Sequence, residues 1–246
     1  MSEDRPIIAV CGKGGVGKTA VSALVARALL DAGVKPLLLI DADPVGGLCS
    51  AVGEQPAKTL ARARAEVIAA ARGADDAAKD RLAQSLDYYV MEALHECEGY
   101  AILAMGQSEE RGCFCPANAL LREAIDLLAE PFGAVLIDAE AGVEQIRREV
   151  TRRVTRVLGV TDGSARGAET LRQIAAMVGP ERIGVVCNRG GGADSVPGGM
   201  ALAGAIPEDE TLRQYDREGR TLWELPEGNA ALEAVRTLVE GLNVGA

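Results

Sequence analysis

The chain of 246 residues is long enough for one α/β domain with a sizeable core, and its formal net charge is −10. This charge argues against nonspecific binding to nucleic acid or to an anionic membrane, because such binding usually needs a basic patch or tail. Residues 1–5 lack the pattern of a secretion signal and no apolar run approaches the length of a membrane span, so we expect a cytoplasmic protein. Six cysteines in such a chain indicate core residues, metal ligands or redox groups rather than disulfides.

The first predicted elements are a strand over 7–11 and a helix over 19–32, joined by the motif G-x-x-x-x-G-K-T at 12–19. Such a loop turns successive backbone amides toward a β-phosphate, while Lys18 reaches the β- and γ-oxygens and the Thr19 hydroxyl holds Mg²⁺. The positive N-terminus of the helix points at the same anion. The sequence therefore predicts a nucleotide-binding loop. Its expected contact residues are Gly12, Gly14, Gly15, Val16, Gly17, Lys18 and Thr19.

A second lysine, Lys13, stands inside this loop. With it, the loop resembles the deviant Walker A motif of the superfamily that includes MinD, ArsA and the nitrogenase iron protein. The resemblance implies that Lys13 reaches across a nucleotide-sandwiched homodimer and supplies charge to the transition state of ATP hydrolysis, as an arginine finger does. A solvated loop lysine is the alternative interpretation.

A strand over 36–40 leads into Asp41-Ala42-Asp43-Pro44, which places two carboxylates beside the phosphate loop. The superfamily resemblance implies that Asp43 positions the attacking water, so that Lys13, Lys18 and Asp43 form the expected catalytic set. Asp41 is expected to contact Mg²⁺ through a water molecule. The alternative role for Asp43 is that of a helix N-cap.

The stretch 53–86, rich in alanine and arginine, predicts a helical insert within a single domain over 1–246. Beyond it, His95 and Cys97 stand near acidic residues, and two interpretations stay open. The pair could be a transient entry site for nickel. Otherwise His95 is a solvated histidine on a helix or loop, which is the commoner case.

The strand predicted over 100–105 is followed by a C-x-C pair, Cys113 and Cys115. Two thiols one residue apart supply half of a tetrahedral thiolate site, and a twofold axis would supply the other half. Soft thiolates favour Ni²⁺, Zn²⁺ or an iron–sulfur cluster, so we predict a metal site shared across a homodimer. A redox pair or incidental surface thiols are the alternatives.

The remaining elements alternate between strands and helices. Strands are predicted over 133–137, 154–160, 183–187 and 200–206, and helices over 117–129, 166–178, 208–218 and 228–242. This alternation predicts an α/β fold with a doubly wound, mainly parallel sheet and a ligand site at the carboxyl ends of the strands. Asp138 occupies the Walker B position and is expected to hold Mg²⁺ through water. Asn188 resembles the superfamily residue that hydrogen-bonds adenine, and a turn asparagine is its alternative.

Four segments together resemble one narrower family. They are Met105-Gly106 through Gly112-Cys113-Phe114-Cys115, then Asp138-Ala139-Glu140-Ala141-Gly142, then 161–167 and 204–209. They are similar to the CooC family of carbon monoxide dehydrogenase accessory ATPases, and the similarity covers nearly the whole chain apart from the helical insert. It implies an ATP-hydrolysing homodimer that binds Ni²⁺ or Zn²⁺ through Cys113 and Cys115. Its client would be an apoenzyme of the carbon monoxide dehydrogenase or acetyl-CoA synthase kind.

The rival interpretation is an ATP-gated reductase resembling the nitrogenase iron protein, in which the same four thiolates hold a [4Fe–4S] cluster. That protein places its two cluster cysteines far apart in the chain, one of them downstream of the switch that follows the Walker B strand. In this chain the close pair is C-x-C, and no cysteine occurs over 138–150. The spacing therefore favours the metallochaperone.

Overall fold

The computed structural model describes residues 5–71, 86–107, 124–139, 153–190, 192–242 and 244. Within them, one eight-stranded sheet has the order β3-β4-β2-β5-β1-β6-β7-β8. Neighbouring strands pair in parallel, except that β3 and β4 are antiparallel. The strands are β1 Ile7–Gly12, β2 Leu37–Asp41, β3 Leu94–Cys97, β4 Tyr100–Ala104, β5 Ala134–Asp138, β6 Arg156–Thr161, β7 Ile183–Asn188 and β8 Ala201–Ile206. The predicted α/β fold with a mainly parallel sheet is confirmed.

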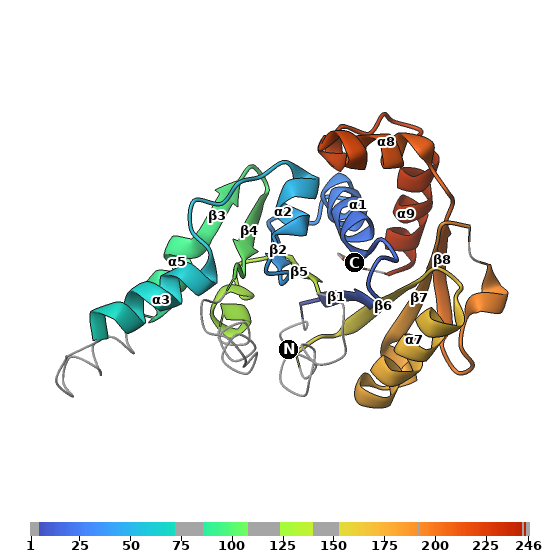
Figure 1. Cartoon of the computed structure of the whole chain (residues 1–246), viewed down its shortest axis with the longest axis horizontal. Coiled ribbons are helices and arrows are strands. Elements are labelled where there is room, and N and C mark those ends of the chain that lie inside the picture. Colours follow the sequence, from blue (N-terminus) through green and yellow to red (C-terminus); the bar gives the residue numbers. More distant parts are fainter. Residues whose placement is uncertain are drawn as a thin grey trace.

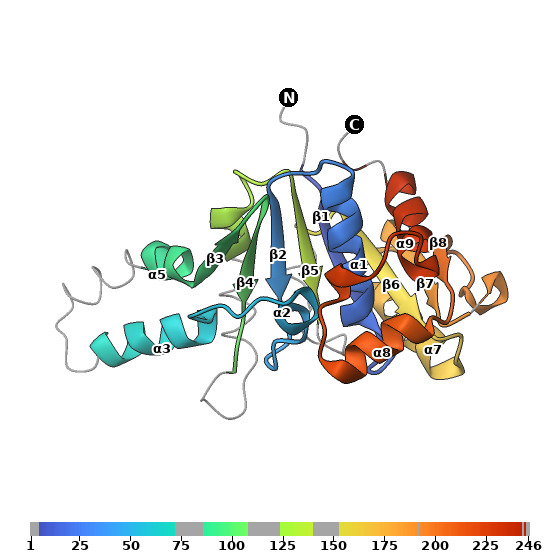
Figure 2. The ribbon, with the colours of Figure 1, turned by 90° about the horizontal axis from the view of Figure 1, so that it is seen from above.

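Helices cover both faces of this sheet (Figures 1 and 2). They are α1 Lys18–Asp31, α2 Gly47–Val52, α3 Leu60–Ala71, α5 Leu86–Ala93, α7 Ala165–Val178, α8 Glu210–Glu218 and α9 Ala230–Gly241, with the short 3₁₀ turns η1 Pro180–Arg182, η2 Ala193–Ser195 and η3 Leu222–Glu224. One hydrophobic core joins α1, α2 and α9 to the sheet, and a second core on the other face takes in α3, α5 and α7. In the described part of the chain, no helix has both the length and the apolarity that crossing a bilayer requires.

The strand register brings three chemically important positions to one edge of the sheet. Asp138, the last residue of β5, pairs in register with Asp41 of β2 on one side and with Val10 of β1 on the other. β1 then ends at Gly12, where the phosphate loop begins. Parallel strands present their carboxyl ends at the same edge, so the loop and both aspartates lie together there.

The edge strand β3 was not predicted, and it corrects the expected setting of His95. His95 lies on this strand, opposite Ile102 of β4, rather than on a helix or an open loop. β3 has only four residues, Leu-His-Glu-Cys, and its polar alternation gives no continuous apolar run of the kind that marks the buried strands. Its pairing comes from the tight turn to β4, in which Gly99 adopts a φ of +82°.

Within the predicted insert over 53–86, the described residues are helical from Leu60 to Ala71, and those before Leu60 form a connecting segment. α3 and α5 are helical, and Figure 1 shows both projecting away from the sheet beyond β3 and β4. The helical character extends past the predicted end at residue 86, to Ala93. Residues 72–85 lie outside the described residues, as does most of the helix predicted over 117–129, of which 124–128 are helical.

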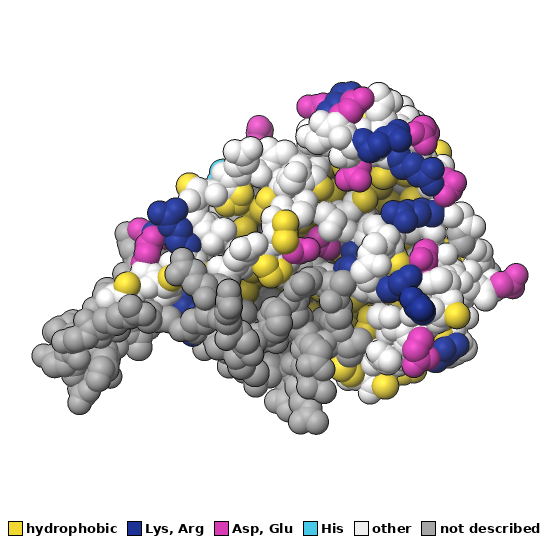
Figure 3. Space-filling view, viewed as in Figure 1, with side chains coloured by type: hydrophobic (Ala, Val, Ile, Leu, Met, Phe, Trp, Pro, Cys, Tyr) yellow, Lys and Arg dark blue, Asp and Glu magenta, His cyan; other side chains and the backbone are white. Residues whose placement is uncertain are grey.

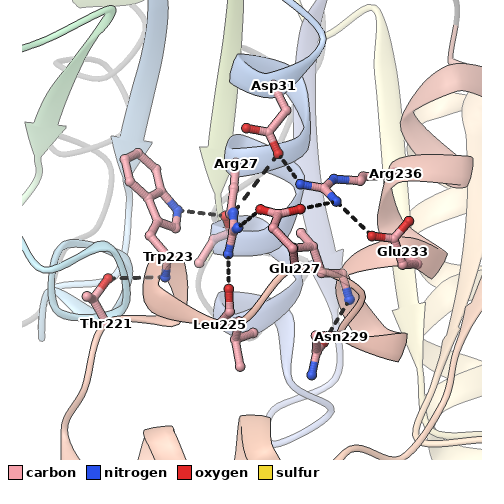
Figure 4. Close-up of polar contacts among 11 residues, drawn as sticks. Arg27, Asp31, Thr221, Trp223, Leu225, Glu227, Asn229, Glu233 and Arg236 are labelled. Carbon is pink, nitrogen blue, oxygen red and sulfur yellow. Dashed lines mark hydrogen bonds and ion pairs between the residues drawn. The ribbon is translucent and has the colours of Figure 1, made fainter.

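A polar network fastens α9 to α1 on the side of the first core (Figure 4). The Arg27 guanidinium donates to the Leu225 carbonyl at 2.7 Å and to Glu227 at 2.6 Å. Arg236 of α9 in turn contacts Glu227 and Asp31, each at 2.7 Å. Because Glu227 bridges both arginines, the segment between η3 and α9 is held against the helix that carries the phosphate loop.

Trp223 contacts both α1 and strand β4. Its indole Nε1 donates to the Ala23 carbonyl of α1 at 2.9 Å. Its ring packs edge-on against Tyr100 of β4, with ring centroids 4.8 Å apart and an interplanar angle of 69°. An edge-to-face pair of this kind is favourable because the ring edge is positive and the face negative.

Candidate functional site

The loop between β1 and α1 has a backbone that only glycine can supply at two points. Gly12 has a φ of +149°, and a Cβ there would lie 2.3 Å from the Val160 carbonyl oxygen. Gly17 has a φ of +90°, and a Cβ there would lie 2.5 Å from Asn188 Nδ2. The loop is therefore locked between β6 and β7 by contacts too close for any side chain.

A cleft of about 450 Å³ opens beside this loop. The phosphate loop and the start of α1 form one wall, and residues 206–216 at the end of β8 and in α8 form the other. The volume falls within the usual range for small-ligand sites, and the position at the carboxyl ends of the strands is the one that open α/β sheets use for ligands. Of the predicted contact residues, Gly14, Gly15, Gly17, Lys18, Thr19, Asp43 and Asn188 line this cleft.

Asp138, at the end of β5 next to β1 and β2, carries a buried oxygen without a hydrogen-bond partner in the described part of the chain. Its Oδ1 accepts from Ser22 Oγ at 2.8 Å, whereas its Oδ2 has no hydrogen-bond partner among the described residues. Burial raises its pKa from 3.8 to about 6, while hydrogen bonds from Ser22 and Thr19 oppose that rise. A buried carboxylate oxygen without a partner is costly unless a cation balances it. The residues therefore fit Mg²⁺, which Thr19 and Asp138 would hold beside a nucleotide.

The two aspartates after β2 have different surroundings. Asp41 is fully buried, and both of its oxygens accept backbone N–H groups, from Cys49 at 2.9 Å and from Asp43 at 3.2 Å. Burial raises the pKa of Asp41 above its usual value. Asp43 lines the cleft, and its Oδ1 accepts from the Val45 amide at 2.9 Å. The N-cap of α2 is Gly46, so the alternative role of Asp43 as that helix's N-cap is wrong.

Asn188 is almost completely buried at the end of β7, between the cleft and the phosphate loop. Its Nδ2 donates to the Val16 carbonyl at 2.8 Å, and its Oδ1 accepts from the Arg189 amide at 3.0 Å. The Asn188 side chain thus holds the backbone of the phosphate loop in place. If the same amide also contacts an adenine ring, it does so while keeping these two hydrogen bonds.

The outer wall of the cleft contains charged residues that the sequence reasoning missed. Arg189, Asp209, Arg213 and Asp216 all line the cleft. Arg189 directly follows Asn188, and its φ of +59° is unusual for a residue other than glycine. That position beside a predicted ligand residue was the signal that could have identified it. The α8 residues offered no comparable signal.

Lys13 is not among the described residues that line the cleft. Its ammonium lies 3.7 Å from Asp162 Oδ2, in the loop after β6, while its carbonyl accepts from Lys18 Nζ at 3.5 Å. Side-chain hydrogen bonding from Ser164 and the nearby Lys13 charge lower the pKa of Asp162. The predicted role of Lys13 in a partner subunit therefore requires this side chain to leave Asp162.

The cysteines differ in accessibility. Cys113 and Cys115 lie outside the described residues, as do Glu140 and Gly142. Cys11, Cys49 and Cys187 are buried free thiols, and burial raises the pKa of Cys11 to about 12. A thiol with so high a pKa stays protonated and unreactive, as expected for a small core residue.

Comparison with known proteins identifies the family of the chain. The sequence profile of CbiA, described as the CobQ/CobB/MinD/ParA nucleotide binding domain, matches residues 7–222. The chain belongs to this family. The chain is therefore a nucleotide-binding domain of the P-loop NTPase type, in agreement with the G-x-x-x-x-G-K-T motif at 12–19.

Three relatives of this CobQ/CobB/MinD/ParA domain show how far the likeness extends. An uncharacterized ATP-binding protein of Methanocaldococcus jannaschii is 34% identical over 95% of this chain and 97% of its own length. The carbon monoxide dehydrogenase accessory protein CooC of Rhodospirillum rubrum is 31% identical, over 89% of each chain. Among solved structures, the cell division ATPase MinD of Pyrococcus furiosus has a TM-score of 0.65 at 23% identity, with 96% of this chain and 98% of that chain covered.

Proposed function

We propose that this protein is an ATP-hydrolysing metallochaperone. It works as a homodimer that binds Ni²⁺ or Zn²⁺ through Cys113 and Cys115 of both subunits. Hydrolysis releases the metal to an apoenzyme of the carbon monoxide dehydrogenase or acetyl-CoA synthase kind. The observation that carries the proposal is the 31% identity to CooC over 89% of each chain, taken together with the C-x-C pair that this chain carries at Cys113 and Cys115.

The cleft geometry supports the hydrolytic half of the proposal. Loop amides and Lys18 would bind the β- and γ-phosphates, and Mg²⁺, when bound by Thr19 and Asp138, would neutralise charge on the same oxygens. Asp43 lines the cleft beside the expected γ-phosphate position, where its carboxylate would orient the attacking water. Phosphoryl transfer to water needs positioning and charge stabilisation rather than a covalent intermediate, and these residues supply both.

Two exposed features next to the cleft support the homodimer. Val45, two residues after Asp43, is 80% exposed, so the segment after β2 presents an apolar side chain that a second subunit would cover. Lys13 belongs to the phosphate loop, and among the described residues its ammonium pairs with the partly exposed carboxylate of Asp162. A second subunit facing both residues would cover Val45 and receive Lys13 at its own phosphates.

The test is an anaerobic metal analysis combined with sizing, on protein with and without Mg²⁺ and ATP, after incubation with Ni²⁺ or Zn²⁺. We expect one ion per nucleotide-stabilised dimer, and none in a Cys113→Ala/Cys115→Ala variant that still binds ATP. Unchanged metal stoichiometry in that variant would overturn the proposal. A parallel iron–sulfur reconstitution that gives about four irons per dimer with a broad band near 400 nm would establish the reductase instead.

A further inference from the structure

A second group of metal-ligating side chains lies away from the nucleotide cleft, at the outer edge of the sheet. Glu54, His95 and Cys97 each present a ligand atom, and these atoms all lie within 4.8 Å of one another. His95 and Cys97 are two residues apart on β3, so their side chains leave the same face of the strand. Glu54 comes from the segment after α2, some forty positions earlier in the sequence.

We propose that Glu54, His95 and Cys97 form a binding site for a borderline divalent transition-metal ion of the Zn²⁺, Co²⁺ or Ni²⁺ kind, with a fourth position open to solvent. This site is independent of the proposed metal at Cys113 and Cys115. It supplies one oxygen, one nitrogen and one sulfur donor, a set that this class of ion prefers over Mg²⁺ or Ca²⁺.

The distances are close to those that such an ion imposes. Around a tetrahedral zinc ion, ligand atoms lie about 3.3–3.8 Å apart, given metal–ligand distances of about 2.0–2.3 Å. His95 Nε2 is 2.9 Å from Glu54 Oε2, so this pair has to open by about 0.4 Å. The widest separation in the group, at most 4.8 Å, has to close by about 1 Å, which a side-chain rotation can supply.

The Glu54 carboxylate is fixed by a partner that is not itself a ligand. Tyr100 OH donates to Glu54 Oε1 at 2.6 Å, which leaves Oε2 directed at His95. Hydrogen bonds from Tyr100 and His95 lower the pKa of Glu54, so this oxygen stays ionised. Carboxylate ligands in metal sites are commonly oriented by such a hydrogen bond. Tyr100 is therefore a positioning residue for the site.

The charge of the three ligands and their access to solvent also fit a divalent ion. A thiolate and a carboxylate together balance one divalent ion, so the loaded site is neutral, which suits its half-buried position. The side chains of His95 and Glu54 are 33% and 27% exposed, and the histidine reaches the surface as the cyan atoms of Figure 3. Three protein ligands with a solvent-facing fourth position are typical of sites that exchange a ligand, whereas structural zinc sites are closed by four.

The experiment is an anaerobic Co²⁺ titration of the full chain in a Cys113→Ser/Cys115→Ser background. The three other cysteines, Cys11, Cys49 and Cys187, are buried, so Cys97 is the accessible thiol in that background. We expect one Co²⁺ per chain with a thiolate-to-cobalt charge-transfer band, and loss of that band when Zn²⁺ is added. Cys97→Ser should abolish the band, and His95→Asn should weaken Co²⁺ binding at least 10-fold.

Two further variants separate the metal site from a purely structural hydrogen-bond cluster. Tyr100→Phe should weaken Co²⁺ binding about 10-fold without removing the band, because outer partners of metal ligands typically contribute 10–100-fold in affinity. Glu96→Gln alters the exposed acid between the two strand ligands and should leave the affinity unchanged. The proposal is overturned if the background protein binds no Co²⁺, or if Cys97→Ser and His95→Asn, folded by circular dichroism, bind it as the background does.

Discussion

The Lys13 ammonium lies 3.7 Å from the Asp162 carboxylate, so the phosphate loop is tied to the loop after β6 by one ion pair. The two side chains are 34% and 29% exposed. Ion pairs this open to solvent contribute at most about 1 kcal/mol. The contact is therefore strong enough to position Lys13 in an isolated subunit and weak enough to be exchanged for a partner's phosphate.

If Lys13 acts across a dimer, Lys13→Ala should lower kcat for ATP hydrolysis by at least about 100-fold, because charged fingers of this type contribute large factors to phosphoryl transfer. The affinity of the monomeric Lys13→Ala variant for ATP should differ little from that of the wild-type monomer. Because the ion pair between Lys13 and Asp162 is weak, Asp162→Asn should keep kcat within about 3-fold of wild type. It should also shift the protein concentration that gives the half-maximal rate by less than about 5-fold. Steady-state hydrolysis against protein concentration measures both effects. A full rate in Lys13→Ala would exclude the cross-dimer role.

Asp138 gives the Mg²⁺-free protein a pH-dependent stability. Its folded pKa of about 6 exceeds the ordinary aspartate value of 3.8, so the folded chain binds the proton more tightly than the unfolded chain does. The stabilising effect is present below pH 4 and is lost as pH rises through about 6, by up to about 3 kcal/mol at about 1.4 kcal/mol per unit. Asp41, whose pKa is also raised, adds an effect of the same sign.

Urea unfolding in EDTA at pH 4.5 and pH 7.5 measures this effect. Wild type should lose about 2 kcal/mol more stability across that interval than Asp138→Asn, which retains an acceptor for Ser22 but cannot ionise. Mg²⁺ with ATP should restore the wild-type value at pH 7.5, because the cation pairs with the buried carboxylate. Equal pH slopes in the two proteins would show that Asp138 is not the titrating group.

Gly17→Ala should lower nucleotide affinity at least about 10-fold. The added Cβ would lie 2.5 Å from Asn188 Nδ2, so the bond from Asn188 to Val16 and the loop backbone must shift. Gly33→Ala is the matched control, since Gly33 also has a positive φ but no atom within 4 Å of its added Cβ. It should cost only about 1 kcal/mol of stability. Calorimetric titration with ATP compares the two, and equal losses of affinity would contradict the steric explanation.

The network around Glu227 should stabilise the fold without affecting the nucleotide site. Arg27 is 13% exposed and contacts the Leu225 carbonyl, so Arg27→Ala should cost about 2–3 kcal/mol. Arg172 makes an exposed pair with Glu169 within one helix, and Arg172→Ala should cost less than about 0.5 kcal/mol. Urea unfolding measures the difference, and an ATP affinity that stays at the wild-type value confirms that the effect is on stability alone. A similar cost for both variants would show that burial does not strengthen the Arg27 contacts.

The sequence predicted well those parts of the site that follow apolar strands. Asp41, Asp138 and Asn188 all end buried strands, and a parallel sheet necessarily gathers such positions at one edge. The phosphate loop was predictable because its geometry demands glycine at fixed spacing. Local patterns were sufficient for these residues, since each is placed by the strand that immediately precedes it.

Other residues were not predictable because distant segments place them. Arg213 and Asp216 reach the cleft through α8, whose packing is set by β8 and α9 rather than by its own polar sequence. Glu54 meets His95 only because β3 pairs with β4 at the edge of the sheet. Neither of these long-range placements produces a periodic pattern in the sequence.

Trp223 is the chain's only tryptophan, and its indole donates a hydrogen bond to α1 while its ring contacts Tyr100. One neighbour belongs to the helix that begins at the phosphate loop, and the other holds the Glu54 carboxylate. When tryptophan is excited selectively over the four tyrosines, the intrinsic fluorescence therefore comes from a single side chain positioned between the two sites. A shift of its emission on adding ATP, and a separate one on adding Zn²⁺, would let both ligands be followed in the same cuvette.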